Sequence, residues 1–284
     1  KINPRAKEID AKDTADILKT MNTEDMETVL AVSRALEQIK QAADDAYWAV
    51  QGGGSIIYVG AGTSGRLGVL DASEMPPTFN VPQSLIRAII AGGQRALTSS
   101  VEGAEDDEEA GRISIMDAKP PDMILGLSAS GGAPFVLAAL KEGKRKGLKC
   151  WLLTCNELEY DFLDGTINVI TGPEIIAGST RLKAGTATKL VLNMLSTTVM
   201  IKLGRVYNGY MIDVVPSNKK LKRRSIKIIQ EVTGCSDEEA IQLFKKSNGN
   251  SKRAILMHLK GVTLERANTL LTQSEGSLRK ALLS

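Results

Sequence analysis

The sequence predicts an α/β protein in which a five-stranded parallel sheet carries helices on both faces, in three layers, with N-terminal helices before it and a small all-α bundle after it. Between residue 55 and about residue 203, short β-branched runs alternate with longer helical stretches, which is typical of βα units. After about Val215 the pattern is helical throughout. The chain has 284 residues, 43% of them hydrophobic, enough for one main core and a smaller module. We therefore expect a helical segment over residues 1–50, the α/β domain over 51–215 and a helical domain over 216–284.

One long helix is expected ahead of the first strand. The stretch from Asn22 to Val50 repeats apolar residues at helical spacing and is followed by three glycines, Gly52 to Gly54. The repeated positions are Met26, Val29, Leu30, Val32, Leu36 and Ile39.

Five runs have the length and the β-branched content of strands. Each is apolar at successive positions, which predicts burial on both faces, and right-handed crossovers then place helices on both sides of the sheet. The predicted strands are Ser55 to Val59, Leu85 to Ile90, Met123 to Leu127, Cys150 to Thr154 and Ile167 to Thr171.

The C-terminal segment repeats itself with a period of 27 residues. Gly234, Ala240, Leu243, Gly249, Ala254 and Ile255 recur as Gly261, Ala267, Leu270, Gly276, Ala281 and Leu282. This pattern predicts two copies of a helix-turn-helix unit in a small UBA-like domain. A structural bundle without chemistry and a lid or partner-binding module are both compatible with it.

Composition and charge exclude several classes of protein. The balance of 36 basic and 33 acidic residues gives a net charge of +3, and the basic run 219–224 lacks aromatic residues, which favours a solvated helix face over a nucleic-acid site. No apolar run approaches the roughly 20 residues of a membrane helix, and the first residues do not resemble a signal peptide. We expect a cytoplasmic protein.

Neither a disulfide framework nor a metal centre is expected. The three cysteines, Cys150, Cys155 and Cys235, form no CxxC pair and are odd in number, which favours a reducing compartment. The single histidine, His258, lies in the repeated tail without neighbours at metal-ligand spacing, and we interpret it as a helix-surface residue. No metal and no cofactor are predicted.

A glycine-rich turn with two hydroxyl groups follows the first predicted strand. Glycines permit a tight turn, and free N–H groups at the start of the next helix can hold an anion. The spacing differs from the dinucleotide fingerprint, and the second strand ends without a ribose-binding acid. A bare strand-to-helix turn is the alternative. The candidate anion ligands are Gly62, Thr63, Ser64, Gly65 and Arg66.

A second turn of this kind follows the third strand. It contains Ser128, Ala129, Ser130 and Gly131, and Pro134 then suits the first turn of a helix. Because both turns follow parallel strands, we expect them to meet in one crevice that holds a phosphate. A third polar segment, Gly178 to Ala187, adds Ser179 and Lys183 as candidates. An ordinary helix cap is the alternative for Ser179.

Two glutamates are candidates for acid–base chemistry. Glu74 precedes Met75-Pro76-Pro77, which should end the helix that Ser64 begins. A helix C-terminus and apolar neighbours both favour a protonated carboxyl group, so Glu74 is a candidate general acid. Glu105 lies in an acidic stretch, residues 102–109, and the local physics does not distinguish it from the other acids there.

Residues 58–79, YVGAGTSGRLGVLDASEMPPTF, closely resemble the N-acetylmuramic acid 6-phosphate etherases, whose core is a Rossmann-like sugar isomerase (SIS) domain. Further similar blocks occur in the family's order, and the leader and the helical tail are also similar, so that the resemblance covers nearly the whole chain. These blocks are IAGG at 90–93, VEGAED at 101–106, SASG at 128–131, GSTRLKAGTA at 178–187 and LNMLS at 192–196.

The resemblance implies a lyase of peptidoglycan amino-sugar metabolism. Such an enzyme cleaves the D-lactyl ether of N-acetylmuramic acid 6-phosphate by elimination and hydration, giving N-acetylglucosamine 6-phosphate and D-lactate. The family's proton donor falls on Glu74 and its second catalytic acid on Glu105. We assign Glu74 to protonate the leaving oxygen and Glu105 to remove the C2 proton, and the reverse assignment stays open. The turns at Thr63 to Arg66 and Ser128 to Gly131 would hold the sugar phosphate.

The spacing along the predicted helix suggests a homodimeric site. Ten residues separate Ser64 from Glu74, which is about 15 Å along a straight helix and longer than a hexose phosphate. We therefore expect the site to lie at or near a subunit interface, in keeping with the family's dimeric habit. Family members often carry Arg-Thr where this chain has Gly132-Ala133, which bears on phosphate affinity.

Two other functions remain open on the same fold. The glucokinase regulatory protein resembles this family and senses sugar phosphates without catalysis, but it carries two such domains. An aldose–ketose isomerase would share ring opening and deprotonation at C2, yet it explains neither Glu74-Met75-Pro76-Pro77 nor residues 101–106.

Overall fold

The computed structural model describes residues 1–216 and 218–284, which form two compact units. The first unit contains Lys1–Ser73 and Gln83–Ser196, and the second contains Glu74–Pro82 and Thr197–Ser284. Two helices, α3 (Gly62–Phe79) and α6 (Lys183–Lys202), begin in the first unit and end in the second.

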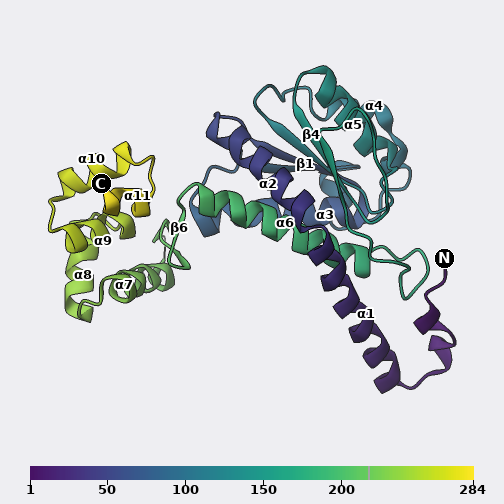
Figure 1. The fold of residues 1–284 in the computed structure, drawn as a ribbon, viewed down its shortest axis with the longest axis horizontal. Helices are drawn as coiled ribbons and strands as arrows, with labels where there is room; N and C mark the ends of the chain where they lie inside the picture. Colours follow the sequence, from purple (N-terminus) through teal and green to yellow (C-terminus); the bar gives the residue numbers. More distant parts are fainter. Residues whose placement is uncertain (217) are drawn as a thin grey trace. The chain divides into compact units, whose positions relative to one another are not determined.

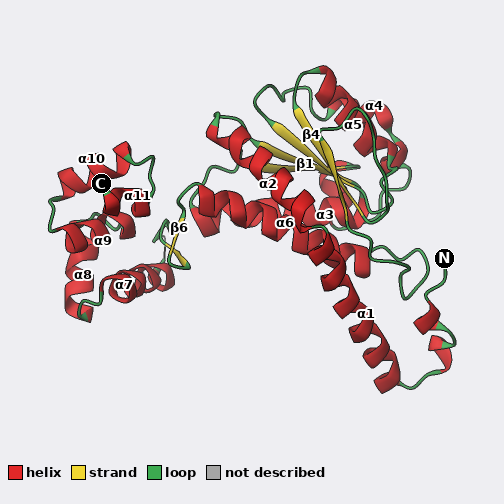
Figure 2. Ribbon diagram, viewed as in Figure 1, coloured by secondary structure: helices red, strands yellow, loops and turns green. Residues whose placement is uncertain are grey.

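The first unit is built on a parallel sheet (Figure 2), whose five strands have the order β2-β1-β3-β4-β5. This confirms the predicted fold class. The strands are β1 (Ile56–Gly60), β2 (Ile86–Ile90), β3 (Met123–Leu127), β4 (Lys149–Thr154) and β5 (Gly165–Asn168). In the register of the sheet, Gly60 pairs with both Ile90 and Leu127, so the turns after β1, β2 and β3 begin at the same edge.

Helices cover both faces of this sheet (Figure 1). On one face lie α2 (Leu36–Gln51), the first part of α3, and α6; on the other lie α4 (Glu108–Ile113) and α5 (Pro134–Arg145). The alternation of β1 explains this arrangement, because Ile57 and Val59 pack into the core beneath α5, whereas Tyr58 points toward α3.

The single N-terminal helix that we predicted from Asn22 to Val50 is wrong in two respects. The structure has α1 (Thr14–Arg34) and α2, which are separated at Ala35, where φ is −96° and ψ is 6°. The first helix also begins earlier, because the Asp13 side chain accepts a hydrogen bond from Asp16 N and caps it. Apolar periodicity located the helical region but did not reveal the break or the cap.

The prediction that Met75-Pro76-Pro77 ends the helix is also wrong. Helix α3 begins at Gly62 and continues through both prolines to Phe79. Each proline removes one N–H donor, but only two residues of the helix follow Pro77, so little of the helical ladder is lost. The helix closes where Asn80 N donates to Pro76 O at 3.0 Å.

The outer strands differ from the expectation of burial on both faces. The strands β2 and β5 form the two edges of the sheet, and several of their residues are only partly buried. The fifth strand is Gly165–Asn168, earlier than the predicted Ile167 to Thr171. An edge strand has one neighbour only, so its composition need not be as apolar as that of a central strand.

The second unit contains a short hairpin followed by helices. The strands β6 (Val206–Tyr207) and β7 (Tyr210–Met211) pair through the turn Asn208-Gly209, a hairpin signal that our sequence analysis did not use. The helices are α7 (Lys219–Thr233), α8 (Asp237–Lys246), α9 (Ser251–Lys260), α10 (Leu264–Gln273) and α11 (Leu278–Leu283).

The 27-residue repeat is visible in the structure of these helices. Gly234 and Gly261 adopt the same left-handed conformation, with φ of 74° and 62°, and each precedes a helix of ten residues. Ala240 and Ala267 are both fully buried at corresponding positions of those helices. The repeat in sequence therefore reflects repeated caps and repeated core positions.

Candidate functional site

The turn between β1 and α3 presents backbone N–H groups at the edge of the sheet. The first backbone hydrogen bond of the helix runs from Gly65 N to Ala61 O at 3.1 Å. The N–H groups of Gly62, Thr63 and Ser64 therefore precede the helical ladder, where N–H groups point outward and the helix dipole favours an anion. This geometry is suited to a phosphate group.

Glu105 lines a cavity together with this turn. The cavity has a volume of about 350 Å³, and Gly62, Arg66, Gly103 and Glu105 are among the residues around it. Glu105 lies on η4 (Ala104–Asp106), a short 3-10 helix, and is exposed to solvent. Two groups of residues that the sequence analysis considered separately thus lie around one hollow.

Arg66 has a structural role in this turn. Its Nε donates to the carbonyl oxygen of Ala96 at 2.9 Å, and its Nη2 donates to that of Ser99 at 3.0 Å. The guanidinium group thereby holds the loop after β2 beside the cavity. A role for Arg66 in binding the substrate stays a prediction.

The loop after β3 is organised by its own hydroxyl groups. Ser128 Oγ accepts hydrogen bonds from Gly131 N at 3.1 Å and from Ala133 N at 3.4 Å, and Ser130 Oγ accepts one from Gly132 N at 3.2 Å. Ser128 is buried, whereas Ser130 is exposed. Because β1 and β3 are neighbours in register, this loop and the β1–α3 turn start side by side.

Two residues that were not predicted from the sequence hold the same loop through its backbone carbonyl groups. Asn156 Nδ2 donates to the carbonyl oxygens of Ala129 and Ser130, at 3.2 and 3.1 Å, and the Tyr160 hydroxyl donates to that of Gly131 at 3.2 Å. Both residues follow β4 in a segment without regular structure. Their composition gave no signal, since an Asn and a Tyr in a loop have many possible roles.

The start of α6 lies against the β1–α3 turn. A Cβ atom built on Gly185 would be 3.6 Å from Thr63 Cγ2, an ordinary van der Waals contact. The polar segment 178–187 is therefore close to the first predicted anion turn, as expected for a shared site. The N-terminus of α6 is already occupied, however, because the Glu174 carboxylate accepts hydrogen bonds from Lys183 N and Ala184 N, both at 2.9 Å.

Lys183 is only 3% exposed and is paired inside the protein. Its Nζ lies 2.5 Å from Glu24 Oε2 and 3.2 Å from the carbonyl oxygen of Pro173. These contacts indicate a structural role, and the assignment of Lys183 to the phosphate site stays a prediction. Ser179, whose N–H donates to Ile176 O at 2.9 Å, is partly buried in the preceding loop.

A buried polar cluster joins β1, α3 and α6 behind the site. Asp71, on α3, accepts hydrogen bonds from the Tyr58 hydroxyl at 3.1 Å, from Asn193 Nδ2 at 2.9 Å and from Ser196 Oγ at 3.2 Å. Burial raises the pKa of Asp71 above its ordinary value, and the three hydrogen bonds offset only part of that effect. The same burial, together with the neighbouring Asp71 carboxyl, raises the pKa of Tyr58.

Glu74 belongs to the second unit and is exposed on the last turns of α3. Because the helix does not end at Met75, the negative end of its dipole lies beyond Phe79 rather than beside Glu74. The expectation that a helix end adjoins Glu74 is therefore wrong. Met75 and Phe79 are buried whereas Glu74 is exposed, and the role of Glu74 as a general acid stays a prediction.

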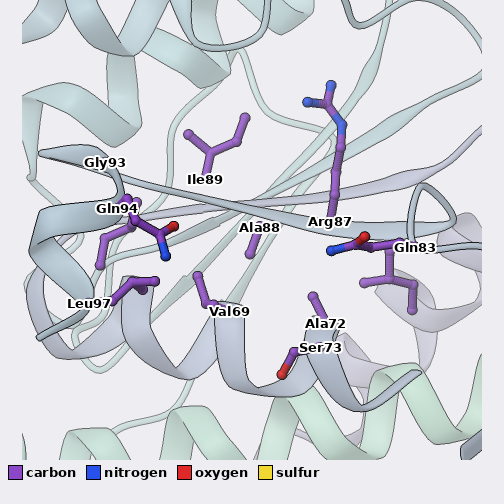
Figure 3. Close-up of a pocket in the computed structure, with 12 residues that line it drawn as sticks. Val69, Ala72, Ser73, Gln83, Arg87, Ala88, Ile89, Gly93, Gln94 and Leu97 are labelled. Atoms are coloured by element: carbon purple, nitrogen blue, oxygen red, sulfur yellow. The ribbon is translucent and has the colours of Figure 1, made fainter. Parts of the chain in front are cut away.

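A second cavity, of about 400 Å³, lies between β2 and α3 and contains none of the predicted site residues (Figure 3). Val69, Ala72 and Ser73 line it from the helix, and Ala88 lines it from the strand. Its lining is largely apolar and has no group suited to acid–base chemistry. It is not part of the candidate site.

The described residues contain no group of three or more His, Cys, Asp or Glu side chains that could hold a metal ion. His258 lies with Nδ1 3.2 Å from Glu239 Oε1 on the C-terminal helices. The three cysteines are free, and burial raises the thiol pKa of both Cys150 and Cys155 to about 12. Over residues 1–216 and 218–284, every helix falls short of the length and apolarity that crossing a membrane requires.

Comparison with family models matches residues 31–144 to the glucokinase regulatory protein N-terminal SIS domain and residues 230–263 to a UBA-like domain. Among solved structures, the chain is similar to the c3406 protein of E. coli CFT073, with a TM-score of 0.51 and 14% identity over 70% of this chain and 97% of that one. At this identity the likeness concerns the fold alone.

Similarity to two bacterial proteins extends over almost the whole chain. N-acetylmuramic acid 6-phosphate etherase 1 of Bacillus licheniformis is 49% identical over 99% of this chain and 93% of its own length. N-acetylmuramic acid 6-phosphate etherase of Geobacillus thermodenitrificans is 45% identical over 99% of this chain and 96% of its own. Since the matched region spans 99% of this chain in both cases, the resemblance seen in the sequence is confirmed, and the chain belongs to the N-acetylmuramic acid 6-phosphate etherase family.

Proposed function

We propose that this protein is a carbon–oxygen lyase that cleaves the D-lactyl ether of N-acetylmuramic acid 6-phosphate, giving N-acetylglucosamine 6-phosphate and D-lactate. Family membership supports the substrate class. The observation that carries the proposal within the structure is that Glu105 and the β1–α3 turn line one cavity. A carboxylate and an anion site around one cavity suit a sugar that bears a phosphate at one end and an acidic C–H group at the other.

The proposed reaction begins with ring opening, because the C2 proton becomes acidic only next to the aldehyde of the open chain. Glu105 removes this proton, the C3–O bond to lactate breaks, and a C2–C3 double bond forms. Glu74 gives its proton to the departing lactate oxygen. Water then adds its hydroxyl to C3 and a proton to C2, which completes the product sugar. The two glutamates could also act in the reverse roles.

We assign the 6-phosphate to the N–H groups of Gly62, Thr63 and Ser64 and to the loop Ser128 to Gly131. The outward N–H groups and the helix dipole at the start of α3 support this assignment. Gly132 and Ala133, which follow this loop, offer no side-chain cation. The backbone and hydroxyl groups therefore supply most of the phosphate contacts in this proposal.

A homodimer with the site at or near the subunit interface is part of the proposal. Ser64 and Glu74 are ten residues apart on the uninterrupted helix α3, which is about 15 Å along its axis. A hexose phosphate bound at the start of this helix does not reach so far along it, so Glu74 of a partner subunit would complete the site. The proposed location is the bacterial cytoplasm, which the three free cysteines support.

Mixing two inactive variants tests this arrangement. Glu74→Gln and Arg66→Ala proteins are combined under conditions that exchange subunits, and activity is compared with that of each variant alone. Shared sites should restore up to about a quarter of the parent activity, because random exchange leaves half of the molecules as heterodimers with one intact site each. No recovery in verified heterodimers would count against a site completed by the partner.

Incubation with N-acetylmuramic acid 6-phosphate in ¹⁸O-water tests the reaction itself. Elimination followed by hydration gives unlabelled lactate and a sugar labelled at C3. A ketose phosphate would instead support an aldose–ketose isomerase. Tight binding of the sugar phosphate with no lactate at any protein concentration would support a sensor without catalysis, related to the glucokinase regulatory protein, and would exclude the lyase.

A further inference from the structure

Glu24 is the centre of a buried polar cluster at the N-terminal side of the first unit. It lies on α1, is 5% exposed, and accepts three hydrogen bonds from side chains. Asn3 Nδ2 donates at 2.8 Å, Arg5 Nη1 at 2.7 Å and Lys183 Nζ at 2.5 Å. Two cations and one amide from distant parts of the sequence thus converge on one carboxylate.

The cluster also holds the loop that precedes α6. The carbonyl oxygen of Pro173 accepts hydrogen bonds from Asn3 Nδ2 at 3.0 Å and from Lys183 Nζ at 3.2 Å. The N-terminal arm, residues 1–13, is therefore connected to the loop by a side chain and not only through α1. Asn3 is 3% exposed, so this connection is closed to solvent.

From this loop the contacts continue to the proposed phosphate turn. Glu174, next to Pro173, holds the N–H groups of Lys183 and Ala184 at the start of α6. The next residue, Gly185, lies close to the turn, because a Cβ atom built on it would be 3.6 Å from Thr63 Cγ2. A shift of the loop would move the start of α6 and, with it, one wall of the β1–α3 turn.

The members of the cluster depend on one another electrostatically. A buried ammonium or carboxylate group without its partner is costly, so removal of Glu24 would leave Lys183 charged and poorly solvated beside the site. When every polar group of a buried cluster has a hydrogen-bond partner, the segments that carry these groups are held in one arrangement. Such a cluster suits a segment whose position matters for binding.

We infer that Glu24 is a positioning residue of the substrate site: it joins the N-terminal arm to Lys183 and so fixes residues 172–187 against the β1–α3 turn. This inference rests on the proposed phosphate site. Lys183 then influences binding through the position of α6, and its ammonium group need not touch the phosphate. The arm contributes to substrate affinity although Asn3 and Arg5 do not line the cavity beside Glu105.

The test removes the arm's contacts and leaves both Glu24 and Lys183 in place. In the variant Asn3→Ala/Arg5→Ala, we expect KM for the sugar phosphate to rise about 10- to 100-fold with kcat nearly unchanged, because small displacements of a binding segment are expensive. Amide hydrogen exchange of peptides covering 172–187 should accelerate in the absence of substrate, while the central strands keep their protection. Restoring the cation with Asn3→Ala/Arg5→Lys should recover part of the lost affinity.

Lys7→Ala is the matched control. Lys7 is an exposed cation of the same arm. Among the described residues, the hydrogen bonds to Glu24 come from Asn3, Arg5 and Lys183 instead. The Lys7→Ala variant should leave KM and exchange at parental values. Unchanged exchange over 172–187 in Asn3→Ala/Arg5→Ala, or equal acceleration throughout the protein, would overturn the inference. Amide hydrogen exchange is measured without any catalysed reaction. It therefore tests whether the cluster positions residues 172–187 even if the protein releases no lactate and the proposed function is wrong.

Discussion

Gly60, the last residue of β1, and Gly65, in the first turns of α3, are packed backbone against backbone. A Cβ atom built on Gly65 would lie 2.9 Å from both the carbonyl carbon and the carbonyl oxygen of Gly60, and 2.7 Å from Ile90 Cγ1. Built on Gly60, it would lie 2.8 Å from Gly65 Cα. The chain can therefore reverse this closely, and place its N–H groups at the edge of the sheet, only because both residues lack a side chain.

Gly65→Ala should damage both the turn and binding. The added methyl group meets backbone atoms that cannot move independently, so we expect a loss of about 1–3 kcal/mol in the free energy of unfolding. KM for the sugar phosphate should rise, because the N–H groups of the turn are displaced. Urea unfolding and steady-state kinetics measure the two effects. Gly132→Ala is the control for stability, since a Cβ atom there meets nothing within 4 Å, and equal losses in the free energy of unfolding for the two variants would contradict this prediction.

Glu105→Gln should abolish most of the activity without affecting folding. The substitution removes a proton acceptor and keeps the size of an exposed side chain, so kcat should fall about 10²- to 10⁴-fold while the unfolding midpoint stays constant. The rate of lactate release measures the first effect, and urea unfolding the second. Glu108→Gln, in the first turn of α4, is the control among the neighbouring acids. A kcat for Glu105→Gln within a few-fold of the parent would exclude Glu105 as the base.

Asp71→Ala should destabilise the protein because it leaves buried donors without an acceptor. Tyr58 and Ser196 are fully buried, and both donate to Asp71 together with Asn193. We expect a loss of about 2–4 kcal/mol in the free energy of unfolding for Asp71→Ala and about 1 kcal/mol for Tyr58→Phe, which removes a single hydrogen bond. Ser73→Ala, at an exposed position of the same helix, should be nearly neutral. If Tyr58→Phe costs as much as Asp71→Ala, the cluster does not act through Asp71.

The Glu24 cluster should make stability depend on pH in the acidic range. Burial by itself raises the pKa of Glu24, but the hydrogen bonds from Lys183, Arg5 and Asn3 outweigh it and hold the pKa below its ordinary value. A carboxyl group with a depressed folded-state pKa contributes stability above its unfolded-state pKa of about 4.3, and this contribution is lost as the pH falls through the folded-state value.

Urea unfolding of the parent and of Glu24→Gln at several pH values measures this contribution. The parent should be the more stable protein at pH 6, and the difference should shrink as the pH is lowered below about 4. Lys40→Gln, at an exposed position of α2, is a control for the general effect of charge. A difference between parent and Glu24→Gln that stays constant from pH 7 to pH 3 would show that the ionisation of Glu24 does not stabilise the fold.

The parallel sheet, the two glycine-containing turns, the helical repeat and the family could all be predicted from the order of the residues. These features are local: strands come from short apolar runs, turns from glycine and hydroxyl residues, and repeats from spacing. The places where local rules failed are also informative. Pro76 and Pro77 lie inside α3 because they fall in its last turn, and the N-terminal helix breaks at Ala35 although its apolar pattern continues.

Which of these residues share a surface could not be predicted in this way, because it depends on the folding of distant segments onto one another. The tertiary structure brought Glu105 to the cavity of the β1–α3 turn, placed Gly185 against Thr63, and paired Lys183 with Glu24 across 159 residues of sequence. Charge and spacing could not separate a lysine that binds phosphate from one that pairs with a buried carboxylate, because both require only a cation beside a polar loop. The difference lies in burial and in the nearest partner, which are properties of the folded chain.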